Sequence, residues 1–304
     1  MREVTLVLTY KRSEFLWCAL EAIKQAEPSM QIVVFPDRGT KEDEVCEHFN
    51  VEQHLTLKHL YDGNSYAMLT ALKWAYDKMY ERVFIVEDDA VIEPDFFSWC
   101  RKALETKPDS FAACGWQYSP DAMIGNGPDL LMPWYLSVCA CIPRKSLYGI
   151  VQHARPEYFS DMGGYLDRVY PNSHRRGTRH WEQDGLVLRV CESEGKRCVW
   201  PRRPRATHIG FHGYHTEGQQ PRGTLEERVA LAKLALKDPA LLKRLMAGAV
   251  PPEMEHCSEC DRPLLSENKE AIKICVACFH AKRPELPVTS GSHYYFPKLE
   301  ESHA

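Results

Sequence analysis

Short apolar segments recur along the first ninety residues and are separated by longer segments with mixed polarity. The apolar runs over Val4–Thr9, Gln31–Pro36 and Arg82–Val86 have the length and composition of buried strands. Each run is followed by a polar turn or by a residue that can begin a helix. The pattern therefore predicts three strands in this part of the chain.

Two amphipathic helices are predicted between these strands. Ser13 can cap the first helix, and Asn64 or Ser65 can cap the second. Strands separated by helices of this length predict βαβ units, an α/β fold and a mostly parallel central sheet flanked by helices. The expected apolar face of the second helix consists of Met68, Leu72, Ala75, Tyr76 and Met79.

The middle of the chain is less regular, and two helices are predicted near residues 224–246. Thr224 with Glu227 at the third helical position is a capping box, which marks the start of a helix. In order, the expected elements are strands over Ser110–Trp116 and Trp134–Ile142, a turn at 125–128, a helix over Asp184–Gly195, a basic strand broken by prolines up to Pro204, a helix from Thr224 to about Lys237, and a helix over Pro239–Met246.

The final fifty residues contain two closely spaced cysteine pairs. Cys257 and Cys260 are separated by two residues, as are Cys275 and Cys278, and 14 residues lie between the pairs. This spacing predicts a tetrahedral structural Zn²⁺ site. The other eight cysteines show no framework-like spacing, so we expect free thiols in or near the core.

These patterns predict four parts of the chain. A large α/β domain is expected over 1–222 and a helical linker over 223–250. A small zinc-binding module with four cysteine ligands follows over 251–284, after the boundary at Pro251-Pro252, and a polar tail occupies 285–304.

Three consecutive acids, Glu87, Asp88 and Asp89, follow the third predicted strand. Ligands bind at the carboxyl ends of the strands in parallel α/β sheets, and this is such an end. The chain contains no GxGxxG after the first strand and no GxxxxGK[ST] motif. A nucleotide would therefore be held through Mn²⁺ or Mg²⁺ bound to carboxylates. The alternative is a polar cap on a strand, but charge between two apolar runs is costly unless it is used.

The overall charge narrows the choice of partners. The formal net charge of −4 gives no overall basic field for nucleic acid. No apolar stretch approaches the roughly 20 residues of a membrane span, so no membrane partner is expected. The predicted location is cytoplasmic, in the host cytoplasm if the source is viral. One local exception is a run of seven arginines: Arg175, Arg176, Arg179, Arg197, Arg202, Arg203 and Arg205.

Glu87–Phe97 resembles the "EDD…APDFF" segment of GT-A glycosyltransferases related to the Golgi N-acetylglucosaminyltransferase that starts complex N-glycans. The likeness extends to Thr5–Arg12, Phe35–Gly39 and Gly63–Tyr76, as a pattern over roughly Val4 to Gly213. The resemblance implies a GT-A fold and a nucleotide-sugar donor, such as UDP-glucose or UDP-N-acetylglucosamine.

The same resemblance implies roles at the acidic site. Asp89 would be the main ligand of Mn²⁺ or Mg²⁺, and His208 resembles a histidine that helps to bind the metal in some relatives. Asp88 would contact the donor sugar or ribose, with Glu87 supporting it. A structural role for His208 is the alternative.

Arg12 and Asp37 resemble the residues that contact the nucleotide base at the ends of the first two strands. The alternatives are a loop cation at Arg12 and a turn residue at Asp37.

An inverting transferase needs a carboxylate that takes the proton of the acceptor hydroxyl. Trp181–Arg189 resembles the family pattern E-D-x-x-L-x-x-R, which makes Asp184 the candidate base and Glu182 the second candidate. Gln183 departs from the pattern, because it stands where an acid is usual. The alternative role for Asp184 is a helix N-terminal carboxylate that favours the helix dipole.

The acceptor is predicted from basic and aromatic residues. The arginine run and the basic residues of the cysteine module favour a polyanion, and aromatic residues can stack a flipped base. A hydroxymethylated base in DNA, modified by a viral or bacterial enzyme, fits these features. A glycan or protein acceptor and an inactive, nucleic-acid-binding zinc protein are the alternatives. The aromatics, which can equally belong to the core or to a sugar-stacking wall, are Trp116, Tyr118, Trp134 and Tyr135.

Overall fold

The computed structural model describes residues 2–37, 42–54, 64–116, 127–174, 176, 183–212, 221, 223–248, 254–256 and 263–265, the backbone alone at 183, 254–256 and 263–265. The chain divides into two units, Met1–Ile209 and Gly210–Ala304. The predicted sites that lie outside the described residues are Glu182, Cys257, Cys260, Cys275 and Cys278.

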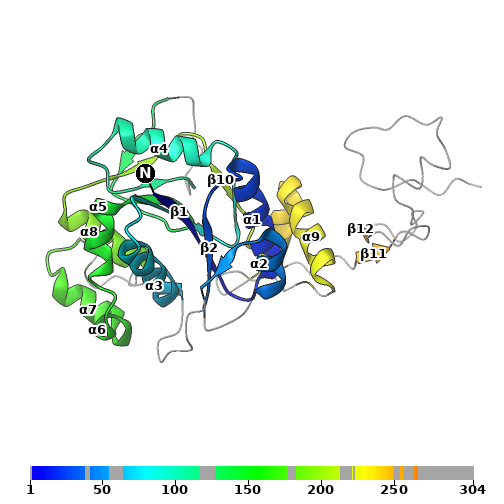
Figure 1. Cartoon of the computed structure of the whole chain (residues 1–304), viewed down its shortest axis with the longest axis horizontal. Coiled ribbons are helices and arrows are strands. Elements are labelled where there is room, and N and C mark those ends of the chain that lie inside the picture. The colour runs from blue at the N-terminus through cyan, green and yellow to red at the C-terminus, as the bar shows by residue number, and fades with distance from the viewer. Residues whose placement is uncertain are drawn as a thin grey trace, which may run out of the picture. The chain divides into compact units, whose positions relative to one another are not determined.

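One eight-stranded sheet organises the described part of the first unit, in the order β3-β2-β1-β4-β8-β6-β9-β7 (Figure 1). Strands β3, β2, β1 and β4 are parallel, β8 runs against β4 and β6, β9 is parallel to β6, and β7 runs against β9. The predicted α/β fold with a mostly parallel sheet is confirmed. The strands are β1 (Glu3–Thr9), β2 (Ile32–Pro36), β3 (Glu52–Gln53), β4 (Arg82–Glu87), β6 (Ala113–Cys114), β7 (Leu130–Met132), β8 (Cys139–Pro143) and β9 (Cys198–Trp200).

Helices flank both faces of this sheet (Figure 1). Consecutive residues of β1 point to opposite faces, and nearly all of them are buried, so both faces need to be covered. Val4, Leu6 and Leu8 of β1 belong to one core cluster with residues of α3, α5 and α8. These three helices also contact one another, while α4 contacts β6 and β8. The helices are α1 (Ser13–Ala26), α2 (Asp43–Phe49), α3 (Asn64–Asp77), α4 (Phe96–Thr106), α5 (Arg144–Val151), α6 (Pro156–Ser160), α7 (Met162–Val169) and α8 (Gln183–Ser193).

A separate two-stranded ribbon follows the acidic triplet. Strand β5 (Ala90–Ile92) pairs antiparallel with β10 (Ala206–His208), and Ala90 lies opposite His208. The Ile209 amide extends the pairing by donating to the Asp89 carbonyl at 2.8 Å. Residues more than a hundred positions apart in sequence are therefore fixed side by side. Sequence patterns predicted neither strand as part of this ribbon.

Two predicted helix details are wrong. Ser13 is the first residue of α1 rather than its cap, and its hydroxyl donates to Glu42 at 2.5 Å. Helix α3 ends at Asp77, and Met79 lies beyond it with a φ of 63°. The left-handed backbone at Met79 turns the chain away from the helix axis. Its side chain is 57% exposed instead of completing the apolar face.

Two predicted strands are shorter than expected. Only Ala113–Cys114 of the segment 110–116 is a strand, and β8 begins at Cys139 rather than at Trp134. The residues before β8 make hydrogen bonds to other segments instead. Ser137 binds side chains at the acidic site, and the Trp134 carbonyl accepts from Trp200 Nε1 at 2.9 Å. The segment 134–138 is therefore not a strand, and within it Tyr135 is buried while Trp134 is exposed.

The second unit contains the helices expected near residues 224–246. Helix α9 (Leu225–Lys237) begins with the predicted capping box, in which Glu227 N donates to Thr224 Oγ1 and Thr224 N donates to Glu227 Oε2. Helix α10 (Pro239–Met246) follows, capped by Asp238. Strands β11 (Met254–His256) and β12 (Pro263–Leu265) pair antiparallel. The predicted domain limits and the zinc module remain predictions.

The eight cysteines outside the predicted zinc module are buried free thiols, as expected: Cys18, Cys46, Cys100, Cys114, Cys139, Cys141, Cys191 and Cys198. Among the described helices, none has both the length and the apolar character needed to cross a membrane.

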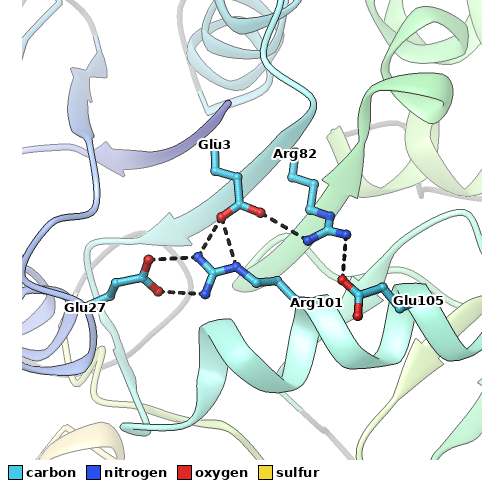
Figure 2. A network of polar contacts seen from close by, with 5 residues as sticks. All are labelled: Glu3, Glu27, Arg82, Arg101 and Glu105. Carbon is cyan, nitrogen blue, oxygen red and sulfur yellow. Dashed lines mark hydrogen bonds and ion pairs between the residues drawn. The ribbon is translucent and has the colours of Figure 1, made fainter. Parts of the chain in front are cut away.

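Charged residues near the amino ends of β1 and β4 form a line of ion pairs that runs from Glu27 to Glu105 (Figure 2). Arg101 on α4 donates to both oxygens of Glu27, at 2.8 and 2.9 Å, and to Glu3 Oε2 at 2.6 and 2.9 Å. Arg82 joins Glu3 to Glu105 at 3.2 and 3.0 Å. The network ties β1, β4, α4 and the end of α1 together. It is structural, because each of the two arginines is partly buried and contacts two carboxylates.

Replacing Arg101 with Met should therefore destabilise the first unit. The change leaves Glu27 without this partner and removes two hydrogen bonds to Glu3, so we expect the free energy of unfolding to fall by about 1–3 kcal/mol. Urea-induced unfolding followed by tryptophan fluorescence measures the change.

The matched control is Arg168→Met. Arg168 pairs with Asp161 at 3.3 Å, and both side chains are more than half exposed. The loss there should stay within about 0.5 kcal/mol. Equal losses in the two variants would contradict the structural role of the network.

Candidate functional site

The parallel pairing of β1 with β4 brings their carboxyl ends together. Leu8 lies opposite Glu87 in this register, and the Asp88 amide donates to the Leu8 carbonyl at 2.9 Å. The segments that leave the two strands, Thr9–Arg12 and Asp88–Asp89, are consequently adjacent. The site begins with this juxtaposition, because it places a guanidinium and three carboxyl groups at one sheet edge.

Arg12 uses all three of its guanidinium nitrogens on the acids. Nε donates to Asp88 Oδ2 at 3.2 Å, Nη2 contacts Asp88 Oδ1, and Nη1 donates to Asp89 Oδ2 at 2.5 Å. Asp88 is fully buried, and it also accepts from Thr9 Oγ1 at 2.8 Å. Burial lowers the pKa of Arg12, but the attraction of Asp88 and Asp89 outweighs it and raises this pKa above its usual value. Arg12 therefore stays charged at every accessible pH.

Asp89 keeps one oxygen without a hydrogen-bond partner among the described residues. Its Oδ2 contacts Arg12 and lies 3.3 Å from His208 Nε2, whereas no described group donates to the buried Oδ1. Burial raises the pKa of Asp89, but Arg12 and His208 outweigh it and hold the pKa at about 2. An ionised carboxylate oxygen without a donor, 4% exposed as a residue, is costly unless a ligand completes it.

His208 reaches Asp89 because of the β5–β10 ribbon. Burial lowers the pKa of His208, but the hydrogen bond and charge of Asp89 outweigh it and raise this pKa above 6.5. The Trp116 ring lies 5.8 Å from the imidazole, measured between centroids. The predicted proximity of Asp89 and His208 is thus present.

Ser137 connects the acidic triplet to the start of α8. Its hydroxyl donates to Glu87 Oε1 at 2.6 Å, and its amide donates to Asp184 Oδ1 at 3.0 Å. Burial raises the pKa of Glu87, and the nearby Asp89 and Asp184 charges add to this effect, so the pKa reaches about 7. Two carboxyl groups from distant segments are held by a single buried serine.

The donor set suits a hard cation at Asp89. Mn²⁺ and Mg²⁺ prefer carboxylate oxygens, and Asp89 Oδ1 is such an oxygen, to which none of the described groups donates. His208 can add a nitrogen ligand when it is neutral. Within the described residues, no group of three or more His, Cys, Asp or Glu side chains could hold a metal ion. A cation here would therefore complete its coordination with water or with a ligand.

The remaining predicted residues lie at varied places. Asp37 follows β2 and is 8% exposed, at the same carboxyl edge of the parallel strands. Tyr135 is buried in the core cluster, whereas Trp134 is 54% exposed. The two adjacent residues therefore do not form one stacking wall.

Sequence reasoning missed two residues of this site. Thr9 and Ser137 make the hydrogen bonds that orient Asp88, Glu87 and Asp184. Thr9 carried a signal, because it is a polar residue at the end of an apolar strand. Ser137 carried none, since it lies inside an apolar segment predicted as a strand.

Removing the Ser137 hydroxyl should raise the pKa of Glu87 further above 7. The hydrogen bond from this hydroxyl favours the ionised carboxylate and lowers the pKa, so Ser137→Ala removes that effect. A pH titration of ¹³C-carboxyl-labelled glutamate measures it, and the Glu87→Gln variant assigns the signal. Ser146→Ala is the control, because Ser146 is buried and its hydroxyl has no partner in the described part of the chain. A lower pKa in Ser137→Ala would contradict this account.

Comparison with known proteins gives one informative similarity in sequence. No family model matches the chain. A glucosyl-dolichyl phosphate glucuronosyltransferase from Haloferax volcanii is 25% identical over 232 residues, which cover 71% of this chain and 72% of that protein. The solved structures that match include the mannosyltransferase PcManGT from Pyrobaculum calidifontis in complex with GDP-Man and Mn²⁺, at 17% identity and a TM-score of 0.45 over 82% of this chain and 69% of that one. S. aureus TarS 1-349 matches at 12% identity and a TM-score of 0.44, over 82% and 70% of the two chains.

Proposed function

We propose that this chain is a GT-A glycosyltransferase that transfers a sugar from a nucleotide-sugar donor to a hydroxyl acceptor. One observation carries the proposal: two carboxylates with different surroundings lie at the carboxyl edge of the sheet. Asp89 has an oxygen to which no described group donates, and Asp184 is held by the Ser137 amide. The resemblance of Glu87–Phe97 to the GT-A segment and the similarity to a glucuronosyltransferase support it.

Asp89 is the proposed ligand of Mn²⁺ or Mg²⁺, with His208 beside it. The fit rests on the buried Asp89 oxygen, which lacks a donor among the described residues, and on the 3.3 Å approach of His208 to the other oxygen. A cation bound there would stabilise the negative charge that grows on a diphosphate leaving group. Asp88 stays paired with Arg12 and Thr9, which fixes the turn that presents Asp89.

Asp184 is the proposed base of an inverting transfer. It lies in the first turn of α8, and the Ser137 amide donates to its Oδ1 at 3.0 Å, which orients the carboxylate that would take the proton of the acceptor hydroxyl. Glu182, outside the described residues, remains the second candidate.

The donor nucleotide is proposed to be UDP, with Asp37 on the base. Asp37 is buried directly after β2, which pairs with β1, and Arg12 lies in the segment that follows β1. Arg12 was predicted to share the base contact, but its three nitrogens contact Asp88 and Asp89. We therefore assign Arg12 to the acidic site rather than to the base.

A hydroxymethylated base in DNA remains the proposed acceptor, based on the predicted zinc module and the arginine run. The described arginines of that run lie at different points of the chain, most of them around β9. Arg197 precedes β9 while Arg202 and Arg203 follow it, and Arg205 pairs with Asp95 at 2.9 Å. A second candidate acceptor comes from the relative's name: a sugar carried on a dolichyl phosphate.

Donor turnover with a panel of acceptors tests the proposal. Release of UDP from UDP-sugars is measured with Mn²⁺, with hydroxymethylated DNA, with a glucosylated polyprenyl phosphate, and with neither. Release stimulated by one acceptor identifies the acceptor class. Absence of donor binding and of release with every nucleotide-sugar tested, including GDP-sugars, would contradict the transferase proposal and favour an inactive binding protein.

Asp89→Asn should abolish Mn²⁺-dependent binding of the donor while the fold stays intact. The amide keeps the shape of the side chain but removes the charge that a divalent cation requires. Calorimetric titration of the UDP-sugar with and without Mn²⁺ measures this. Asp95→Asn is the control, since Asp95 lies in the following turn and pairs with Arg205. Unchanged Mn²⁺-dependent binding in Asp89→Asn would refute the metal assignment.

Asp184→Asn should leave donor binding unchanged and reduce sugar transfer by about 10²–10⁴-fold, because an amide cannot accept the acceptor proton. Steady-state transfer and donor affinity are measured on the same protein sample. Glu192→Gln, at the far end of α8, is the matched control and should retain transfer. Normal transfer by Asp184→Asn would remove it as the base.

A further inference from the structure

We propose that Arg12 acts as an internal counter-cation that occupies Asp89 in the absence of a metal and releases it when metal and nucleotide bind together. This inference rests on the proposed metal site. It goes beyond that site by assigning Arg12 the control of metal access.

The geometry places Arg12 beside the position where a cation would bind to Asp89. Arg12 Nη1 lies 2.5 Å from Asp89 Oδ2, and His208 Nε2 lies 3.3 Å from the same oxygen. Asp89 Oδ1 receives no hydrogen bond from any described residue. One oxygen is thus contacted by Arg12 and His208, and the other is left for an external ligand.

Charge makes the two cations compete. A divalent ion at Asp89 would approach the Arg12 guanidinium, and two positive charges at that spacing repel in a partly buried site. The Arg12 side chain is 21% exposed, so solvent screens this repulsion only in part. Metal alone therefore has to displace Arg12 Nη1 from Asp89, which weakens its binding.

Arg12 can leave Asp89 without leaving the site. Its Nε and Nη2 remain on Asp88, so only the Nη1 contact has to break. The freed nitrogen becomes a donor for an anion. A nucleotide diphosphate supplies such an anion, because guanidinium groups bind phosphate oxygens with good geometry. Metal and diphosphate should therefore bind cooperatively, because the metal frees the Arg12 nitrogen that the diphosphate binds, and the diphosphate stabilises Arg12 away from the metal.

Direct Mn²⁺ binding tests this. Free Mn²⁺ is followed by electron paramagnetic resonance during titration of the full chain, without nucleotide and then with UDP. Arg12→Gln should bind Mn²⁺ alone about tenfold more tightly than the unmodified protein, because one charge-assisted contact no longer competes. Arg12→Lys keeps the positive charge but lacks the planar guanidinium group, so its Mn²⁺ affinity should lie between those of the unmodified protein and Arg12→Gln.

Three controls make the result specific. Lys11→Gln removes the same charge from the neighbouring exposed residue and should not change Mn²⁺ affinity. Arg12→Gln combined with Asp89→Asn should lose the gain, which assigns it to Asp89. Thermal unfolding of each variant shows whether it is folded. If Arg12→Gln does not fold, the Mn²⁺ affinity of Arg12→Lys is the test instead.

The outcomes separate this inference from the proposed function. If UDP-dependent Mn²⁺ binding requires Asp89 but Arg12→Gln binds Mn²⁺ alone no more tightly, Arg12 does not control access and the metal site stands. A gain in Lys11→Gln equal to that in Arg12→Gln would reduce the effect to net charge and overturn the inference. If no Mn²⁺ binds at Asp89 even with UDP and no sugar is transferred, both fail.

Discussion

The parallel pairing of β1 with β4 is the constraint on which the site depends. It delivers the turn after β1 and the acids after β4 to one buried edge, where uncompensated charge would be unstable. Arg12 provides the compensation by contacting Asp88 and Asp89 together. This compensation is incomplete, since Asp89 Oδ1 has no donor within the described structure. The fold therefore tolerates the acids and leaves a place where an external cation is favourable.

The two ends of the same strand pair show the difference between structural and functional charge. At the amino end, Glu3 accepts from both Arg82 and Arg101, and Arg101 also donates to Glu27 (Figure 2). At the carboxyl end, a single guanidinium serves Asp88 and Asp89, and the pKa of Glu87 is raised to about 7. Clusters of perturbed, partly satisfied groups are typical of ligand sites, whereas saturated pairs are typical of structure. Sequence alone does not separate the two clusters, because both consist of ordinary acids and arginines.

Elements that depend on neighbouring residues in the sequence were predicted correctly from the sequence pattern. Strands β1, β2 and β4 and the Thr224–Glu227 capping box follow from periodicity and turn chemistry, and the structure confirms them. The β5–β10 ribbon was not predictable, because its three-residue strands acquire their partners only through tertiary pairing. Ser137 was hidden for the same reason: its value lies in two contacts with segments about fifty residues away on either side. The zinc module, Glu182 and the base-contact role of Asp37 remain predictions from sequence.

The proposed catalytic role of Asp184 is compatible with a structural role at the start of α8. A carboxylate in the first turn of α8 is favoured by the helix dipole, which is the alternative that the sequence left open. That role requires only a charge near the helix end and places no demand on a second segment. The Ser137 amide nevertheless binds Asp184 Oδ1 at 3.0 Å, while the same residue's hydroxyl binds Glu87. A carboxylate that only favours the helix dipole does not need a fixed position relative to the acidic triplet. A catalytic base needs one, because it must lie close to the acceptor hydroxyl while the donor is bound. The bridge through Ser137 is therefore the feature that favours the catalytic role.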